Sequence, residues 1–167
     1  MVFSSTTFLF AFLPLVLFAM LLSPRGVRNL VLLLLSLLFY AWGELQYVLL
    51  MLASIALNYL FGSCIHRARQ EQLNAKAWLV TGIIANLGLL AYFKYANFLA
   101  DNWNWILGQL GAPALELAPV HLPLGISFFT FQAMSYLLDV YRGDAQHDRN
   151  PINIALYIAL FPQLIAG

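Results

Sequence analysis

Four polar side chains recur along one apolar stretch of the sequence, at Gln132, Ser135, Asp139 and Arg142. Spacings of 3, 4 and 3 residues place them within about 80° of one face of an α-helix, because each residue turns the helix by about 100°. A charged side chain costs about 2.5–3.5 kcal/mol at the centre of a membrane and less toward its ends. Two interpretations are open: an ion pair between Asp139 and Arg142 that closes the helix end, or a polar row that supports a cytoplasmic tunnel entrance.

Histidine is the most natural general base near neutral pH, and the sequence has three histidines. His66 and His147 lie in basic stretches that we expect to be turns, and His121 lies between Pro119 and Pro123. We interpret each as a solvated loop residue, although His121 is the nearest to the start of a helix. No catalytic residue is therefore assigned from the sequence.

Other catalytic and ligand-binding signatures are absent from the sequence. Gly125 and Ser127 begin a G-x-S-x-G pattern, but Phe129 replaces its last glycine, and no strand is expected before it. The single cysteine, Cys64, excludes an internal disulfide, and no Cys/His cluster has the spacing of metal ligands. A net charge of +1 provides no basic field for nucleic acid. We expect no metal site, no bound cofactor and no nucleic-acid partner.

The elements that must position these side chains are apolar helices. The 167 residues are 62% hydrophobic and 9% charged, whereas soluble domains have about 45–50% and about 25%. A helix needs about 20 mostly apolar residues to cross a membrane. We expect spans at about residues 7–22, 27–42, 47–65, 77–93, 122–141 and 152–167. The sequence thus predicts an all-α, polytopic transmembrane bundle of five to six spans, in which Pro14 and Pro162 make two helices irregular.

The basic residues predict how this bundle is oriented. They fall on alternate connections between the expected spans: Arg25, Arg28, Arg67, Arg69, Lys76, Arg142 and Arg149. The other connections hold Glu44 and the segment from Lys94 to His121. The positive-inside rule then places the N-terminus outside, with a first helix that is retained because no cleavage site follows it.

The segment at residues 97–111 mixes aromatic and apolar side chains with Asp101 and several amides. This composition is typical of a helix that lies at the depth of the lipid headgroups, with tryptophan anchors. We therefore expect an interfacial helix there, separate from the span before it.

Small and amide residues form two short stripes on the third and fourth expected spans. Ser54, Asn58 and Gly62 follow each other at intervals of four residues, and Gly82 and Asn86 have the same spacing. One helix face carries each stripe, and small residues allow close approach of two helices. A packing stripe is favoured over contact with a substrate.

Several sequence blocks, in this order, resemble the N-terminal part of the bacterial membrane-bound O-acyltransferase (MBOAT) family, and particularly its alginate O-acetylating branch. These blocks cover residues 1–5, 39–42, 58–62, 92–98, 122–132, 135–136, 139–143 and 161–167, with sequences such as Phe-Tyr-Ala-Trp at 39–42 and Leu-Pro-Leu-Gly-Ile-Ser-Phe-Phe-Thr-Phe-Gln at 122–132. The blocks occur over nearly the whole chain.

The resemblance implies a helical enzyme that takes an acyl group from a cytoplasmic thioester donor, acetyl-CoA or similar, and passes it across the membrane. In the alginate-type branch, periplasmic acetyltransferase partners would carry it to hydroxyls of an exopolysaccharide. The resemblance also implies that the family's catalytic histidine lies beyond residue 167, so we expect the 167-residue chain to be an inactive, truncated part of the enzyme.

Two other classes of function fit a bundle of apolar helices. A transporter or flippase component would carry broken helices and intramembrane polar groups, but its usual inverted repeat is not visible, because Pro14 has no counterpart in the second half. A non-catalytic membrane scaffold needs only helix packing. A histidine within a later apolar segment would favour acyl transfer over both.

Overall fold

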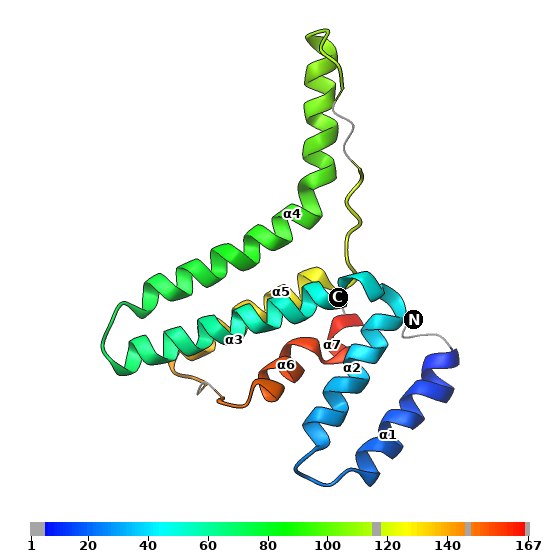
Figure 1. Ribbon diagram of the computed structural model, residues 1–167, viewed down its shortest axis with the longest axis vertical. Helices are drawn as coiled ribbons and strands as arrows, with labels where there is room; N and C mark the ends of the chain where they lie inside the picture. The colour runs from blue at the N-terminus through cyan, green and yellow to red at the C-terminus, as the bar shows by residue number, and fades with distance from the viewer. Residues whose placement is uncertain (1–5, 115–117, 146–147, 166–167) are drawn as a thin grey trace.

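A computed structural model describes residues 6–114, 118–145 and 148–165 of the chain. This part is helical and contains no β-strand (Figure 1). A π-helical turn at Phe8–Phe12 leads into α1, and a 3-10 turn at Leu45–Tyr47 joins α2 to α3. The α-helices are α1 (Leu13–Leu22), α2 (Arg28–Glu44), α3 (Val48–Gln70), α4 (Ala75–Gln109), α5 (Ile126–Arg142), α6 (Pro151–Ala159) and α7 (Phe161–Ile165).

The core of the fold is a three-helix unit in which α3, α4 and α5 pack against one another, while α6 packs on α2 and α3 (Figure 1). Fully buried side chains of this unit include Met51, Ile65, Phe129 and Leu137. A second cluster joins the first turn of the chain to α2 and α7 through four phenylalanines with ring centroids 5.0–6.0 Å apart: Phe8, Phe12, Phe39 and Phe161. The chain thus folds back so that its last described helix contacts its first.

The two stripes predicted on α3 and α4 are confirmed as packing surfaces: their asparagines face each other, and their glycines lie against α5. Asn58 Nδ2 donates to Asn86 Oδ1 at 3.1 Å, and Asn86 Nδ2 donates back to Asn58 Oδ1 at 2.7 Å. Each amide also donates to the carbonyl four residues earlier, on Ser54 and Gly82. A Cβ at Gly62 would lie 2.7 Å from Cε1 of Tyr136, so only glycine permits this approach of α3 and α5.

The expectation of a separate interfacial helix at residues 97–111 is wrong in its boundary. Residues 97–109 belong to α4, which also contains the expected span at 77–93. The composition becomes mixed near Lys94, but the helix continues, because neither glycine nor proline occurs between Lys94 and Gly108. Figure 1 shows that α4 bends and that its second half projects away from the bundle.

Proline and glycine explain the other differences in helix boundaries. The expected span at 152–167 divides into α6 and α7 at Leu160, whose ψ is 117°, two residues before Pro162. The expected span at 122–141 becomes helical only at Ile126, because Pro123 and the left-handed Gly125 (φ 71°) precede it. Pro14 lies in the first turn of α1, after the π-helical turn, so both predicted irregularities are present.

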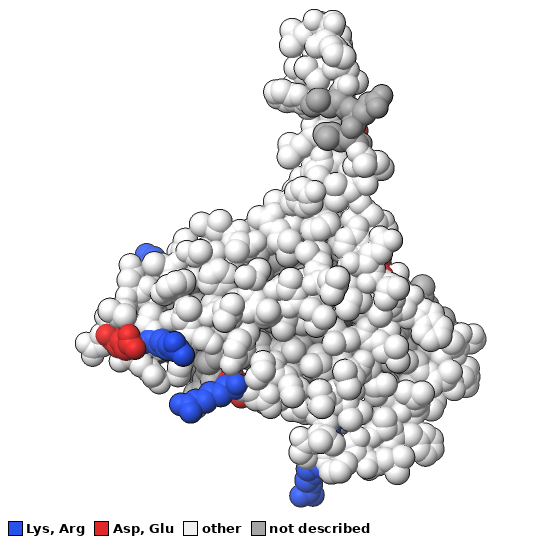
Figure 2. All heavy atoms as spheres, in the orientation of Figure 1, with Lys and Arg blue, Asp and Glu red and all other residues white. Residues whose placement is uncertain are grey.

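Two helical segments are long and apolar enough to cross a membrane: Arg28–Gln70, interrupted by its 3-10 turn, and Ala75–Gln109. Two shorter apolar segments occupy Phe8–Leu22 and Pro151–Gln163. Lysine and arginine atoms are visible in the lower half of Figure 2 and not on the projecting half of α4. The fold is therefore an apolar helical bundle, and the number and direction of its crossings remain predictions.

Candidate functional site

The polar row predicted on α5 contributes to two different places. Gln132 Nε2 donates to Gln163 Oε1 at 3.1 Å and so connects α5 to α7. Gln132 and Ser135 line a hollow of about 260 Å³, together with Phe128 and Phe131. Ser135 is exposed and Gln132 is half-buried. The first two residues of the row, Gln132 and Ser135, thus offer one amide and one hydroxyl beside two aromatic rings.

The last two residues of the row, Asp139 and Arg142, do not form the ion pair that would close the helix end. Asp139 is half-buried and Arg142 is exposed, and they are not joined by an ion pair within the described ranges. Arg69 of α3 closes this helix end instead, because its Nη1 donates to the carbonyl of Val140 at 2.8 Å. The left-handed Gly143 (φ 88°) makes room, since a Cβ there would lie 2.6 Å from Arg69 Nη2.

Sequence reasoning assigned Arg69 only to the charge asymmetry of the connections and missed its contact with α5. A cation near the last carbonyls of a helix offsets their partial negative charge. The glycine that follows Arg142 is the one signal for this contact in the sequence, because glycine commonly ends a helix in the left-handed conformation.

The histidines differ in their surroundings. His66 was expected in a turn between helices, but it lies within α3, near the carboxyl end of this helix. Its Nε2 lies 2.9 Å from Gln70 Nε2. His121 is exposed, its ring stacks on Tyr47 with a centroid distance of 5.7 Å, and its Nε2 lies 3.2 Å from Glu44 Oε1. His147 lies outside the described residues. His121 is thus a solvated residue that connects the segment before α5 to the junction of α2 and α3.

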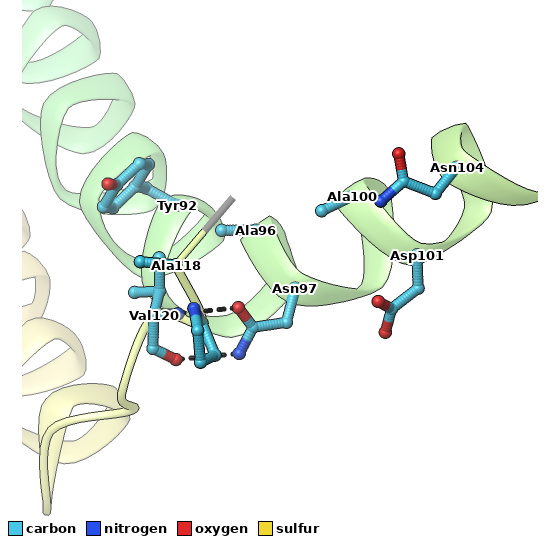
Figure 3. Close-up of a pocket in the computed structure, with 9 residues that line it drawn as sticks. Tyr92, Ala96, Asn97, Ala100, Asp101, Asn104, Ala118 and Val120 are labelled. Carbon is cyan, nitrogen blue, oxygen red and sulfur yellow. Dashed lines mark hydrogen bonds between the residues drawn. The ribbon is translucent and has the colours of Figure 1, made fainter. Parts of the chain in front are cut away.

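A hollow of about 490 Å³ lies between the projecting half of α4 and residues 118–120, which precede α5. Asn97 fixes this segment, since its Nδ2 donates to the carbonyl of Val120 and its Oδ1 accepts from the Val120 N–H, each at 2.8 Å (Figure 3). Tyr92, Asp101 and Asn104 also line the hollow. It offers polar side chains but no base and nucleophile pair.

The described part of the chain offers no cluster of metal ligands and contains two unpaired buried hydroxyls. It contains no group of three or more His, Cys, Asp or Glu residues able to hold a metal ion. Two fully enclosed hydroxyls, of Tyr40 on α2 and Thr130 on α5, have no hydrogen-bond partner among the described residues. Buried hydroxyls are usually paired, so both positions carry an energetic cost within this part of the protein.

Together these features define an apolar, helical protein of the membrane type, with a few polar side chains buried between its helices. Comparison with curated proteins specifies it further. The chain is 45% identical over 167 residues to probable alginate O-acetylase AlgI of Azotobacter vinelandii, and 45% identical to the protein of that name from Pseudomonas aeruginosa. It is 35% identical, over 198 aligned positions, to a peptidoglycan O-acetyltransferase of Helicobacter pylori.

These alignments include the whole chain but only 34%, 32% and 36% of the three relatives, so the chain spans about a third of their length. The resemblance noted in the sequence is confirmed: the chain is homologous to alginate O-acetylases, and the family of these relatives is one of acyltransferases. No family model matches the chain. No solved structure matches it either.

Proposed function

We infer that this chain is the N-terminal membrane part of an O-acetyltransferase that modifies an exopolysaccharide such as alginate. The observation that supports this proposal is the 45% identity that extends over the entire chain. The helical, apolar fold agrees with a membrane enzyme, because only helices or closed barrels satisfy every backbone hydrogen bond in lipid. The bacterial inner membrane is its proposed location.

The proposed reaction moves an acetyl group from a cytoplasmic thioester, such as acetyl-CoA, toward a hydroxyl acceptor on the other side. A charged carrier crosses lipid at high cost, whereas a small acyl group fits a protein tunnel. Gln132 and Ser135, with the hollow that they line, are the proposed contribution of this chain to the support of that tunnel. Periplasmic acetyltransferase partners would then complete the transfer to the polymer.

A segment exchange tests this proposal. The matching third of the Pseudomonas aeruginosa relative is replaced by this chain, and acetyl esters on the secreted alginate are measured by NMR spectroscopy. We expect acetylation to be retained, because the two segments align over all 167 residues. Membrane levels of the chimera are measured in parallel, so that a failure to fold is recognised.

Two controls define the result. The relative without its matching third is expected to give no acetylation. A chimera with the exposed Gly26 changed to alanine is expected to behave as the unchanged chimera, since nothing lies near a Cβ at this position. A chimera that accumulates in the membrane at normal levels but leaves the alginate unacetylated contradicts the proposal. The isolated 167-residue chain is expected to show no transfer of radiolabelled acetyl groups.

A further inference from the structure

A second polar hollow, of about 350 Å³, lies at the carboxyl end of α3, away from the α5 row. We call it the basic hollow, and six residues line it: Tyr59, Ser63, His66, Arg67, Gln70 and Arg149. The first five come from one face of α3, and Arg149 comes from the segment that precedes α6. Its volume lies in the range of sites for small molecules, about 300–1,000 Å³.

Three hydrogen bonds fix the backbone at and beside Arg149. Tyr59 Oη donates to the carbonyl of Arg149 at 3.1 Å and thereby ties this segment to α3. Asp148 Oδ1 accepts from the Asn150 N–H at 2.8 Å, and Asn150 Oδ1 caps α6 by accepting from the Ile152 N–H at 3.0 Å. Arg149 therefore lies between two residues whose side chains fix the turn, and its position needs little ordering when a ligand binds.

The two arginines of the basic hollow form no ion pair within the described ranges. Neither Arg67 nor Arg149 has an ion pair there, and the carboxylate of Asp148 accepts hydrogen bonds from the Asn150 N–H and the Asn153 side chain. Arg69, two residues after Arg67, behaves differently, because it is bound to α5. Two guanidinium groups, one from α3 and one from the segment before α6, thus line the hollow without an ion pair in the described ranges.

We propose that the basic hollow binds a phosphate group, held between Arg67 and Arg149. A guanidinium offers paired N–H donors that match two phosphate oxygens, and two guanidinium groups match the two charges of a phosphate monoester. The carboxyl end of α3 carries partial negative charge, so the arginines rather than this helix provide the attraction. The start of α6, beside Arg149, carries partial positive charge and adds to it.

Two sources can present this chemistry to the basic hollow: a soluble phosphate ester and the headgroup of an anionic lipid. The remaining volume beyond one phosphate leaves space for the group that the phosphate is attached to. The proposal does not depend on acetyl transfer, because binding is measured without any reaction.

The test uses the full-length protein that contains this chain, purified in detergent and in nanodiscs. Line broadening in ³¹P NMR spectra reports the binding of inorganic phosphate, and native mass spectrometry reports retained phosphatidylglycerol against phosphatidylcholine. We expect the double variant Arg67→Gln/Arg149→Gln to weaken binding of phosphate or phosphatidylglycerol at least tenfold. Arg67→Lys keeps the charge but loses the paired donors, and we expect an intermediate loss.

Arg25→Gln is the control for a lost arginine charge, because it removes one positive charge from an exposed residue that does not line the basic hollow. We expect this variant to bind as the unchanged protein does. A loss of phosphate binding in the double variant alone identifies a soluble ester, and a loss of retained phosphatidylglycerol identifies a lipid headgroup. Absence of binding to both probes, or an equal loss with Arg25→Gln, overturns the proposal; thermal unfolding of each variant establishes that it is folded.

Discussion

The buried amide pair between α3 and α4 is the most quantitative feature of the fold. Asn58 and Asn86 are 2% and 4% exposed and exchange two hydrogen bonds, of 3.1 and 2.7 Å. Replacing either residue by alanine removes both bonds and leaves the carbonyl oxygen of the remaining amide without its donor. The remaining NH₂ group keeps its bond to the carbonyl four residues earlier.

The expected cost follows from these contacts. An unsatisfied buried acceptor costs about 1–3 kcal/mol, and hydrogen bonds between helices in membranes contribute about 0.6–2 kcal/mol. A hollow of about 110 Å³ borders both amides and has space for water, which would partly replace the lost partner. We therefore expect about 1–2 kcal/mol for each single variant. The double variant should cost about 1 kcal/mol less than the sum, because both single variants break the same bonds.

Reversible unfolding of the full-length protein in mixed micelles, followed by tryptophan fluorescence, measures these free energies. Asn102→Ala serves as the control, because Asn102 is exposed on α4 and donates to the carbonyl of Phe98, with no bond to another helix. Its effect should be small and should add to that of Asn58→Ala. Additivity of Asn58→Ala and Asn86→Ala within about 0.3 kcal/mol would refute the cross-helix pair.

Three further variants test other contacts. Gly62→Ala should destabilise the protein by about 1–3 kcal/mol because its Cβ meets the ring of Tyr136, whereas Gly88→Ala, with nothing within 4 Å, should be neutral or stabilising in the same unfolding assay. Asp139→Ala should lower thermal stability or expression more than it lowers the acetylation rate per folded molecule; unchanged stability with lost turnover would instead indicate a direct role. Thr130→Val removes a buried hydroxyl that lacks a partner in the described ranges, so the free energy of unfolding should stay the same or rise, and a clear loss would reveal a partner.

The sequence predicted which helix faces are packing surfaces, because the spacing of residues along one helix determines its faces. Ser54, Asn58 and Gly62 lie on one face by spacing alone, and their small or amide side chains imply a close neighbour. Gly82 and Asn86 carried the same pattern on the next helix, and the structure adds that Asn58 and Asn86 pair α3 with α4. Proline positions likewise predicted irregularity, because a missing N–H acts on the backbone wherever the residue lies.

The full length of α4 could not be predicted by searching for apolar runs. Hydropathy reports the surroundings of a side chain, and it changes near Lys94, where apolar residues give way to amides and tryptophans. Helical backbone ends only where a residue disfavours it, and here that occurs at Gly108 and Gly111, the latter in the left-handed conformation (φ 68°). The change in composition near Lys94 was therefore wrongly interpreted as the end of one helix and the start of another.

The candidate site shows why spacing identifies a face but not its partners. The row on α5 was correctly placed on one helix, yet Gln132 bonds to a residue 31 positions away and the end of α5 is closed by a residue 71 positions from Val140. Since Arg69 already satisfies a terminal carbonyl, Asp139 and Arg142 are not needed as an ion pair for that purpose. Gln132 and Ser135 line a hollow, and their support of a tunnel stays a prediction that the acetylation assay of the exchanged segment tests.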